Sequence, residues 1–203
     1  MTRRLTRWIA RVTGLAVVLA AGTVASQASP AAAATCPART LSKPFSSFGD
    51  TNDYFLAPDA TFESGTGSWA LSSASVVSGN EPWKVFGSTH AKSLKLNASG
   101  TATTPSMCIA TAEDSMRFFY RSPGVAGAKL HVHIHVTSGV NVATNDYDVD
   151  GTVAGWAVSQ RIMLPDIRDA SGMQTITITF QPRNSSTATW QLDDVSIDPW
   201  RTV

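Results

Sequence analysis

Three alternating histidines are the residues of this sequence best placed to act together. His131, His133 and His135 alternate with aliphatic residues in the run 129–136. Residues two apart in a β-strand point to the same face, so the three imidazoles line one face. Imidazole titrates near neutral pH and is a common metal ligand. Three interpretations stay open: a plain polar sheet face, a ligand-binding groove, or part of a metal site whose remaining ligand the sequence does not locate. We count the three histidines among the ligand-binding residues.

Two adjacent carboxylates, Asp193 and Asp194, lie in the middle of the last apolar segment, 190–197. Regular strand alternation sends neighbouring side chains to opposite faces, so at most one of them reaches a given ion directly. The pair also has the wrong geometry for a glycosidase, which needs two carboxyl groups facing each other across about 5–10 Å. The sequence contains no G-x-S-x-G or H-E-x-x-H motif. We therefore expect no catalytic residues.

A second acidic run, residues 146–151, matches the first half of a calcium-binding loop, D-x-D-x-D-G. The twelfth position of such a loop carries a bidentate Glu, and here it is Ala157. We interpret the run as a polar hairpin turn at 150–151, with weak calcium binding as the alternative.

Aromatic residues beside loops supply the other candidate binding surface. Trp83, Trp156 and Tyr147 lie near predicted loops or strand ends, and an exposed aromatic face combines apolar area with a polar edge. We predict that these three contribute to ligand binding. Trp69 and Trp190 lie within strand patterns, and we expect them in the core.

The elements that must position these residues are short strands. Period-two alternation is clearest at 129–136 and 174–180. Further strands are predicted at 54–56, 60–63, 69–71, 74–77, 93–97, 115–121 and 190–197. The region 102–109 is predicted as strand interrupted by Pro105, and 156–164 as one strand or a pair of strands. No segment after residue 34 has a 3.6-residue apolar period. The pattern predicts an all-β jelly-roll β-sandwich of two antiparallel sheets, in one domain over 54–203.

The start of the chain predicts export. Residues 1–34 combine four arginines, an apolar run and a final Ala-rich stretch, the arrangement of a cleaved signal peptide. Either general secretion or, through Arg3 and Arg4, the twin-arginine route fits. Cleavage leaves 12 Lys and Arg against 15 Asp and Glu, so we expect a secreted protein with no nucleic-acid partner and no membrane attachment after cleavage. Residues 35–53 are interpreted as an extended lead-in.

The chain has two cysteines, Cys36 and Cys108. In an oxidising compartment such a pair predicts one disulfide, which ties the lead-in to the middle of the domain. Two free thiols are the alternative.

The segments 61–69 and 190–197, with their Phe-Glu-Ser-Gly…Trp and Trp-Gln-Leu-Asp-Asp-Val-Ser-Ile motifs, resemble those of galactose-binding-domain-like β-sandwiches, a fold of many non-catalytic carbohydrate-binding modules. The chain also resembles secreted actinobacterial domains in its segments 79–82 and 117–119. The first resemblance implies a structural calcium held by Glu63 and Asp193, with Asp194 as the alternative ligand.

The function that these features predict is a secreted, non-catalytic binding module for carbohydrate or a cell-surface polymer. Two alternatives remain from the sequence: a secreted protein-interaction or envelope structural domain, and a hydrolase. The sequence leaves the oligomeric state open.

Overall fold

The computed structural model describes residues 35–198. The predicted signal peptide, 1–34, and residues 199–203 lie outside this range. No helix between residues 35 and 198 has the length and apolar character needed to cross a bilayer. The elements of the described range are η1 (Ser46–Phe48), β1 (Phe55–Leu56), β2 (Ala70–Ser78), β3 (Lys92–Thr103), β4 (Met107–Ala110), β5 (Ser115–Ser122), β6 (Lys129–Ser138), β7 (Asn141–Asp150), β8 (Gly155–Val158), β9 (Ile162–Met163), β10 (Met173–Arg183) and β11 (Trp190–Asp198).

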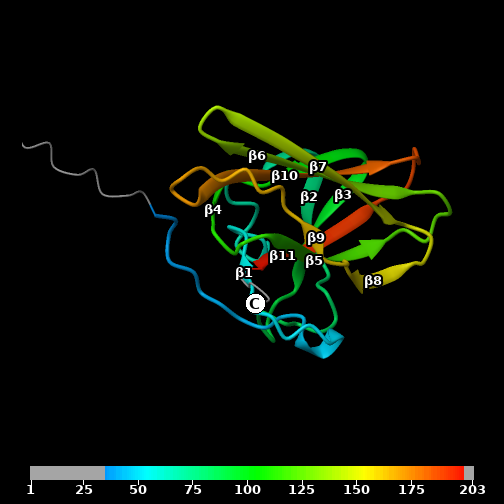
Figure 1. Cartoon of the computed structure of the whole chain (residues 1–203). Coiled ribbons are helices and arrows are strands. Elements are labelled where there is room, and N and C mark those ends of the chain that lie inside the picture. The colour runs from blue at the N-terminus through cyan, green and yellow to red at the C-terminus, as the bar shows by residue number, and fades with distance from the viewer. Residues whose placement is uncertain (1–34, 199–203) are drawn as a thin grey trace, which may run out of the picture. The chain divides into compact units, whose positions relative to one another are not determined.

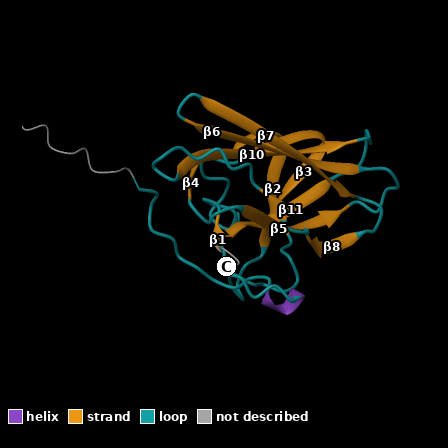
Figure 2. Ribbon diagram, in the orientation of Figure 1, coloured by secondary structure: helices purple, strands orange, loops and turns teal. Residues whose placement is uncertain are grey.

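The strands form an antiparallel sandwich whose two layers share a long strand. The strand order is β7-β6-β10-β3-β11-β5-β8. The first half of β3 pairs with β11 and its last residues pair with β10, so β3 passes from one layer into the other. Figure 1 shows β7, β6 and β10 in the upper part of the view and β5 and β8 below them. Loops make most of the connections (Figure 2). The predicted all-β jelly-roll sandwich is confirmed, with one continuous hydrogen-bonded network joining its two sheets.

The core lies between the layers and consists of the alternating apolar positions. Leu130 on β6 and Phe180 on β10 are fully buried, as are the apolar residues that alternate with the histidines. Trp190 on β11 is fully buried and Trp69 nearly so, as predicted. Each large side chain buried in this way contributes about 1.5–3 kcal/mol. The two layers are therefore held together mainly by apolar contact.

Three segments differ from the sequence predictions. Residues 141–150 do not turn at 150–151 but form β7, which pairs with β6 along its whole length. Residues 70–78 form one strand and not the two predicted at 69–71 and 74–77, because a bulge between Ser72 and Ala74 absorbs the break in alternation. Residues 60–63 lie mostly in turns, with Phe62 at a φ of 55°.

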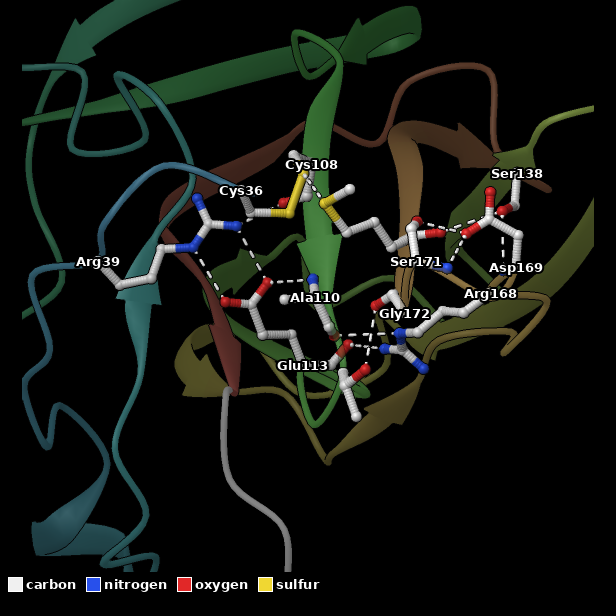
Figure 3. Close-up of a disulfide and its surroundings, with 12 residues drawn as sticks. Cys36, Arg39, Cys108, Ala110, Glu113, Ser138, Arg168, Asp169, Ser171 and Gly172 are labelled. Atoms are coloured by element: carbon white, nitrogen blue, oxygen red, sulfur yellow. Dashed lines mark hydrogen bonds and ion pairs between the residues drawn. A yellow bond between two sulfur atoms is a disulfide. The ribbon is translucent and has the colours of Figure 1, made fainter. Parts of the chain in front are cut away.

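The lead-in is attached covalently and by ion pairs. Cys36 and Cys108 form a disulfide, with Cα atoms 5.4 Å apart, which confirms the predicted pairing. Arg39 donates from two nitrogens to the carboxylate of Glu113 at 3.0 Å, and that carboxylate also accepts the backbone N–H of Ala110 (Figure 3). These contacts pin residues 36–39 against β4.

The second half of the lead-in covers the outer face of β5. Phe45 and Tyr54 are fully buried against Phe119. Asp50 receives hydrogen bonds of 2.7 Å from the Tyr54 hydroxyl and from Arg117. Burial opposes ionisation of Asp50, but these hydrogen bonds outweigh it and hold the pKa of the carboxyl below its usual range.

Asp50→Asn is expected to destabilise the protein by about 2 kcal/mol at neutral pH, because it removes two hydrogen bonds to a charged acceptor. The pKa of Asp50 is lowered in the folded state, so its stabilising effect is present above the unfolded pKa of 3.8 and is lost as the pH falls through the lower folded pKa. Urea unfolding at pH 7 and at pH 3 measures the difference in unfolding free energy between wild type and Asp50→Asn, which should narrow in acid.

Asp53→Asn, which breaks the more exposed pair with Lys43, serves as the control and should cost less than about 1 kcal/mol. An equal effect of Asp50→Asn at both pH values would contradict this account.

Candidate functional site

A bulge in β11 lies at the acidic pair. The pairing of β11 with β5 shifts between Asp193 and Ser196, and Asp194 has a φ of 49°. The predicted regular alternation of Asp193 and Asp194 is therefore wrong at this point. Both side chains are fully buried. The bulge thus places two carboxyl groups in the interior, close enough to influence each other.

The two carboxyl groups differ in their partners. Asp193 accepts the backbone N–H of Glu81 at 3.3 Å and that of Asp194 at 3.0 Å. Both carboxylate oxygens of Asp194 are buried and accept no hydrogen bond from any residue in the range 35–198. Burial raises the pKa of Asp194 far above its usual range, and the nearby charges of Glu81 and Glu63 raise it further. The pKa of Asp193 is also raised far above its usual range, first by burial and then by the charge of Asp194.

Glu63 and Glu81 complete this acidic cluster. The Glu63 carboxylate accepts the backbone N–H groups of Ala91 and Lys92 at 2.7 and 2.8 Å. Glu81, only 1% exposed, accepts the N–H of Val85 at 2.8 Å. A hard divalent cation prefers several carboxylate and carbonyl oxygens. The buried oxygens of Asp194, near the charges of Glu81 and Glu63, have the chemistry that such an ion binds. In this structure no three of these carboxyl groups bring ligand atoms within 4.8 Å of one another, so an ion would draw them closer together.

A polar row crosses the outer face of the layer that contains β3, β11 and β5. Consecutive register pairs join Ser75 to Lys95, Lys95 to Gln191, Gln191 to Arg121, and Arg121 to Trp156. Directly opposite residues of paired strands share a face. We call Ser75, Lys95, Gln191, Arg121 and Trp156 the polar row. Its neighbours along β11, Trp190 and Leu192, are in the core, so the row points outward.

A hollow of about 270 Å³ lies along one end of the polar row. The side-chain oxygen of Gln191 is shielded there and accepts no hydrogen bond from another described residue. The walls are formed by Arg121, Ser122, Pro123, Ala154, Gly155, Thr189 and Gln191. The hollow therefore offers a cation and an amide oxygen. Trp156 pairs with Arg121 and packs, half-buried, against the cluster of Phe45, Tyr54 and Phe119.

Trp83 belongs to the same layer. Its ring lies 4.8 Å from that of Phe48 and 5.4 Å from that of Phe119, and the side chain is 41% exposed. Phe119 pairs with Val158, two residues after Trp156. Trp83 and Trp156 therefore lie near Phe119 on the same outer face. Their positions in the sequence did not indicate this.

The histidine row lies on the outer face of the opposite layer. His131, His133 and His135 pair across β6 and β10 with Gln181, Thr179 and Thr177. Tyr147 packs against the core and pairs with Val132, so it faces away from the histidines. The structure therefore does not bring the predicted aromatic and histidine residues into one site.

Comparison with known proteins identifies the fold. No protein-family model and no curated protein matches the chain. The enzymatically active domain of tailspike protein 4 of bacteriophage CBA120 superposes with a TM-score of 0.50 at 9% identity, over 70% of this chain and 21% of that one. The arabinose-bound α-L-arabinofuranosidase MgGH51 gives 0.48 at 15% identity, over 70% and 26%. TmCBM61, in complex with β-1,4-galactotriose, gives 0.47 at 14% identity, over 70% and 96%.

The chain has a β-sandwich fold, and this fold is what it shares with the tailspike domain. It spans only a minor part of the tailspike and arabinofuranosidase chains. At these identities the likeness concerns the fold, and the function must be argued from the site.

Sequence reasoning missed several residues of this β-sandwich that matter at its candidate sites. Arg121 and Gln191 carry no motif, and only strand register places them beside Trp156. Glu81 joins the acidic cluster through a loop that is distant in sequence from Asp193. The signal that was available is alternation, since Gln191 lies between two core residues and must face outward.

Proposed function

We propose that this β-sandwich is a secreted, non-catalytic module that binds carbohydrate or a cell-surface polymer through the polar row and Trp83. The observation that carries the proposal is the register that sets Trp156 beside Arg121 and Arg121 beside Gln191, the last two of which line the hollow.

The chemistry of this surface suits a sugar chain. An indole face packs on the apolar face of a sugar ring while its edge stays polar. Arg121 and Lys95 donate hydrogen bonds, and the unpartnered oxygen of Gln191 accepts one. The row crosses five adjacent strands, so its length is roughly 19 Å at the usual strand spacing. An extended polymer, contacted at several units, fits such a row better than a single small molecule.

The charges at the hollow support a non-catalytic role. Glycoside hydrolysis needs two carboxyl groups on either side of the scissile bond. The described residues that line the hollow include no carboxylate. The buried Asp193 and Asp194 are withdrawn from solvent at the bulge of β11, so they support a structural role.

We also propose that the acidic cluster around Asp194 holds a structural calcium ion. Asp194 supplies the unpartnered oxygens, with Asp193, Glu63 and Glu81 as the neighbouring carboxylates. Such an ion would neutralise a group of buried carboxyl groups next to the closing strand. Its expected effect is on stability, and it leaves the polar row free for the ligand.

Replacing Trp156 or Trp83 by alanine is expected to weaken polysaccharide binding at least about tenfold, the factor that corresponds to 1.4 kcal/mol. Affinity electrophoresis and pull-down against a panel of polysaccharides, followed by a glycan array, make the measurement. Val142→Ala removes an apolar side chain that is 63% exposed on β7 and serves as the control. Retention on no polymer, or retention that neither tryptophan variant weakens, would refute the proposal. A stable dimer without polymer retention would favour the protein-interaction alternative.

A further inference from the structure

The β6–β7 hairpin sets histidines opposite carboxylates. In its register His131 faces Asp148 and His133 faces Asp146. Because residues 141–150 form the strand β7, Asp146, Asp148 and Asp150 all point to one face of the sheet. This is the face that carries the histidines. Sequence alternation on two strands thereby produces a mixed nitrogen and oxygen cluster.

The cluster is already joined by short contacts. The Oδ1 atom of Asp146 lies 2.9 Å from Nε2 of His131 and 2.7 Å from Nδ1 of His133. The other nitrogen of His131, Nδ1, lies 2.9 Å from Oδ1 of Asp148. His131 is only 7% exposed although it lies on an outer face, so its ring is held in place from both sides. On the β10 side the histidines face the uncharged Thr179 and Gln181.

These atoms match the ligand preferences of zinc-like ions. One ring nitrogen each of His131 and His133 and a carboxylate oxygen of Asp146 lie within 4.8 Å of one another. Zinc binds nitrogen and oxygen at about 2.0–2.2 Å, so tetrahedral ligand atoms are roughly 3.4 Å apart. For a zinc ion to bind between these atoms, the Asp146 oxygen must move away from the two ring nitrogens by roughly half an ångström. Its side chain is 54% exposed and free to adjust.

Asp148 completes the arrangement as a positioning residue. A histidine that binds a metal through one nitrogen usually gives its other N–H to a carboxylate, which selects the tautomer and orients the ring. The contact between His131 Nδ1 and Asp148 has this form. His133 and Asp146 are partly exposed, so the remaining coordination position faces solvent.

We propose that His131, His133 and Asp146 form a binding site for a divalent d-block cation of the zinc class, with Asp148 orienting His131. The site is on the opposite layer from the polar row and is separate from the acidic cluster of Asp194. It takes nitrogen ligands, so its chemistry differs from that of a calcium site.

Isothermal titration of the untagged, calcium-saturated protein with zinc chloride tests the proposal. One zinc ion per chain is expected. His131→Ala and His133→Ala should weaken binding more than about 100-fold, and Asp148→Asn should weaken it about 10–100-fold, the range of second-layer substitutions. Thermal melts of each variant without zinc show whether it folds.

His135→Ala is the matched control. His135 is in the same row but faces Thr144 on β7, so its loss should leave zinc affinity unchanged. If His135→Ala weakened zinc binding as much as His131→Ala does, zinc would be binding to the row of histidines alone, and the proposed site would be overturned. Zinc binding that survives both His131→Ala and His133→Ala, or absence of binding to the folded protein, would also overturn it. An unaltered affinity in Asp148→Asn would overturn the positioning role.

Discussion

Asp194→Asn is expected to have opposite effects on the protein without and with calcium. Without calcium the native protein buries Asp194, and neither of its oxygens has a hydrogen-bond partner within residues 35–198, while the charges of Glu81 and Glu63 are nearby. Because burial raises the pKa of Asp194, folding at neutral pH must either bury its charge or bind a proton, and both cost free energy. The neutral Asn avoids this cost and should raise the melting temperature of the chelated protein. The same change removes the central ligand of the proposed calcium site, so added calcium should no longer stabilise the variant.

The wild-type response sets the scale of this experiment. Calcium at 1,000 times its dissociation constant would stabilise the protein by about 4 kcal/mol, which corresponds to a melting temperature roughly 10 °C higher for a domain of this size. Differential scanning calorimetry with chelator and with excess calcium measures it. A wild-type melting curve that does not respond to calcium would refute the proposed ion.

Two variants make the interpretation specific. Glu63→Ala should abolish the calcium response, but it also removes the acceptor for two backbone N–H groups, those of Ala91 and Lys92. Its stability without calcium should consequently fall, in contrast to that of Asp194→Asn. Asp150→Asn changes an exposed carboxylate paired with Lys129 and is the surface control, with the calcium response retained.

The second large effect is expected from the disulfide. Replacing Cys36 and Cys108 together by serine should lower the free energy of unfolding by about 4 kcal/mol in the chain-entropy account, since the cysteines are 72 residues apart. That loss corresponds to a melting temperature roughly 10 °C lower. The pairs of Arg39 with Glu113 and of Asp50 with Arg117 remain, so the lead-in should stay docked in the native state.

Chemical denaturation of the double variant and of wild type, each with and without reductant, checks this expectation. The two proteins should differ when oxidised and should become nearly equal once wild type is reduced. A difference below about 1 kcal/mol under oxidising conditions would contradict the stabilising role of the bond. Increased protease cleavage within residues 35–53 of the variant would show that the disulfide also holds the lead-in in place.

The sequence alone determined the fold class and much of the core. In the run 129–136 the period of two specified which side chains are buried, and all four aliphatic residues are fully buried. The pairing of Cys36 with Cys108 followed from there being two cysteines. These features are predictable because burial and strand alternation are written locally, within a few residues.

The sites depended on information that no local pattern contains. Alternation indicates the face of a strand, but register between strands decides which side chains meet, and it set Asp146 and Asp148 against His131 and His133. The residues of the acidic run favour a turn, whereas pairing with β6 makes the run a strand. Likewise, the bulge at Asp194 broke the alternation that would have separated it from Asp193. Sequence thus determined what could be buried, and only the tertiary structure decided which polar groups came together, because pairing across strands is a property of the whole sheet.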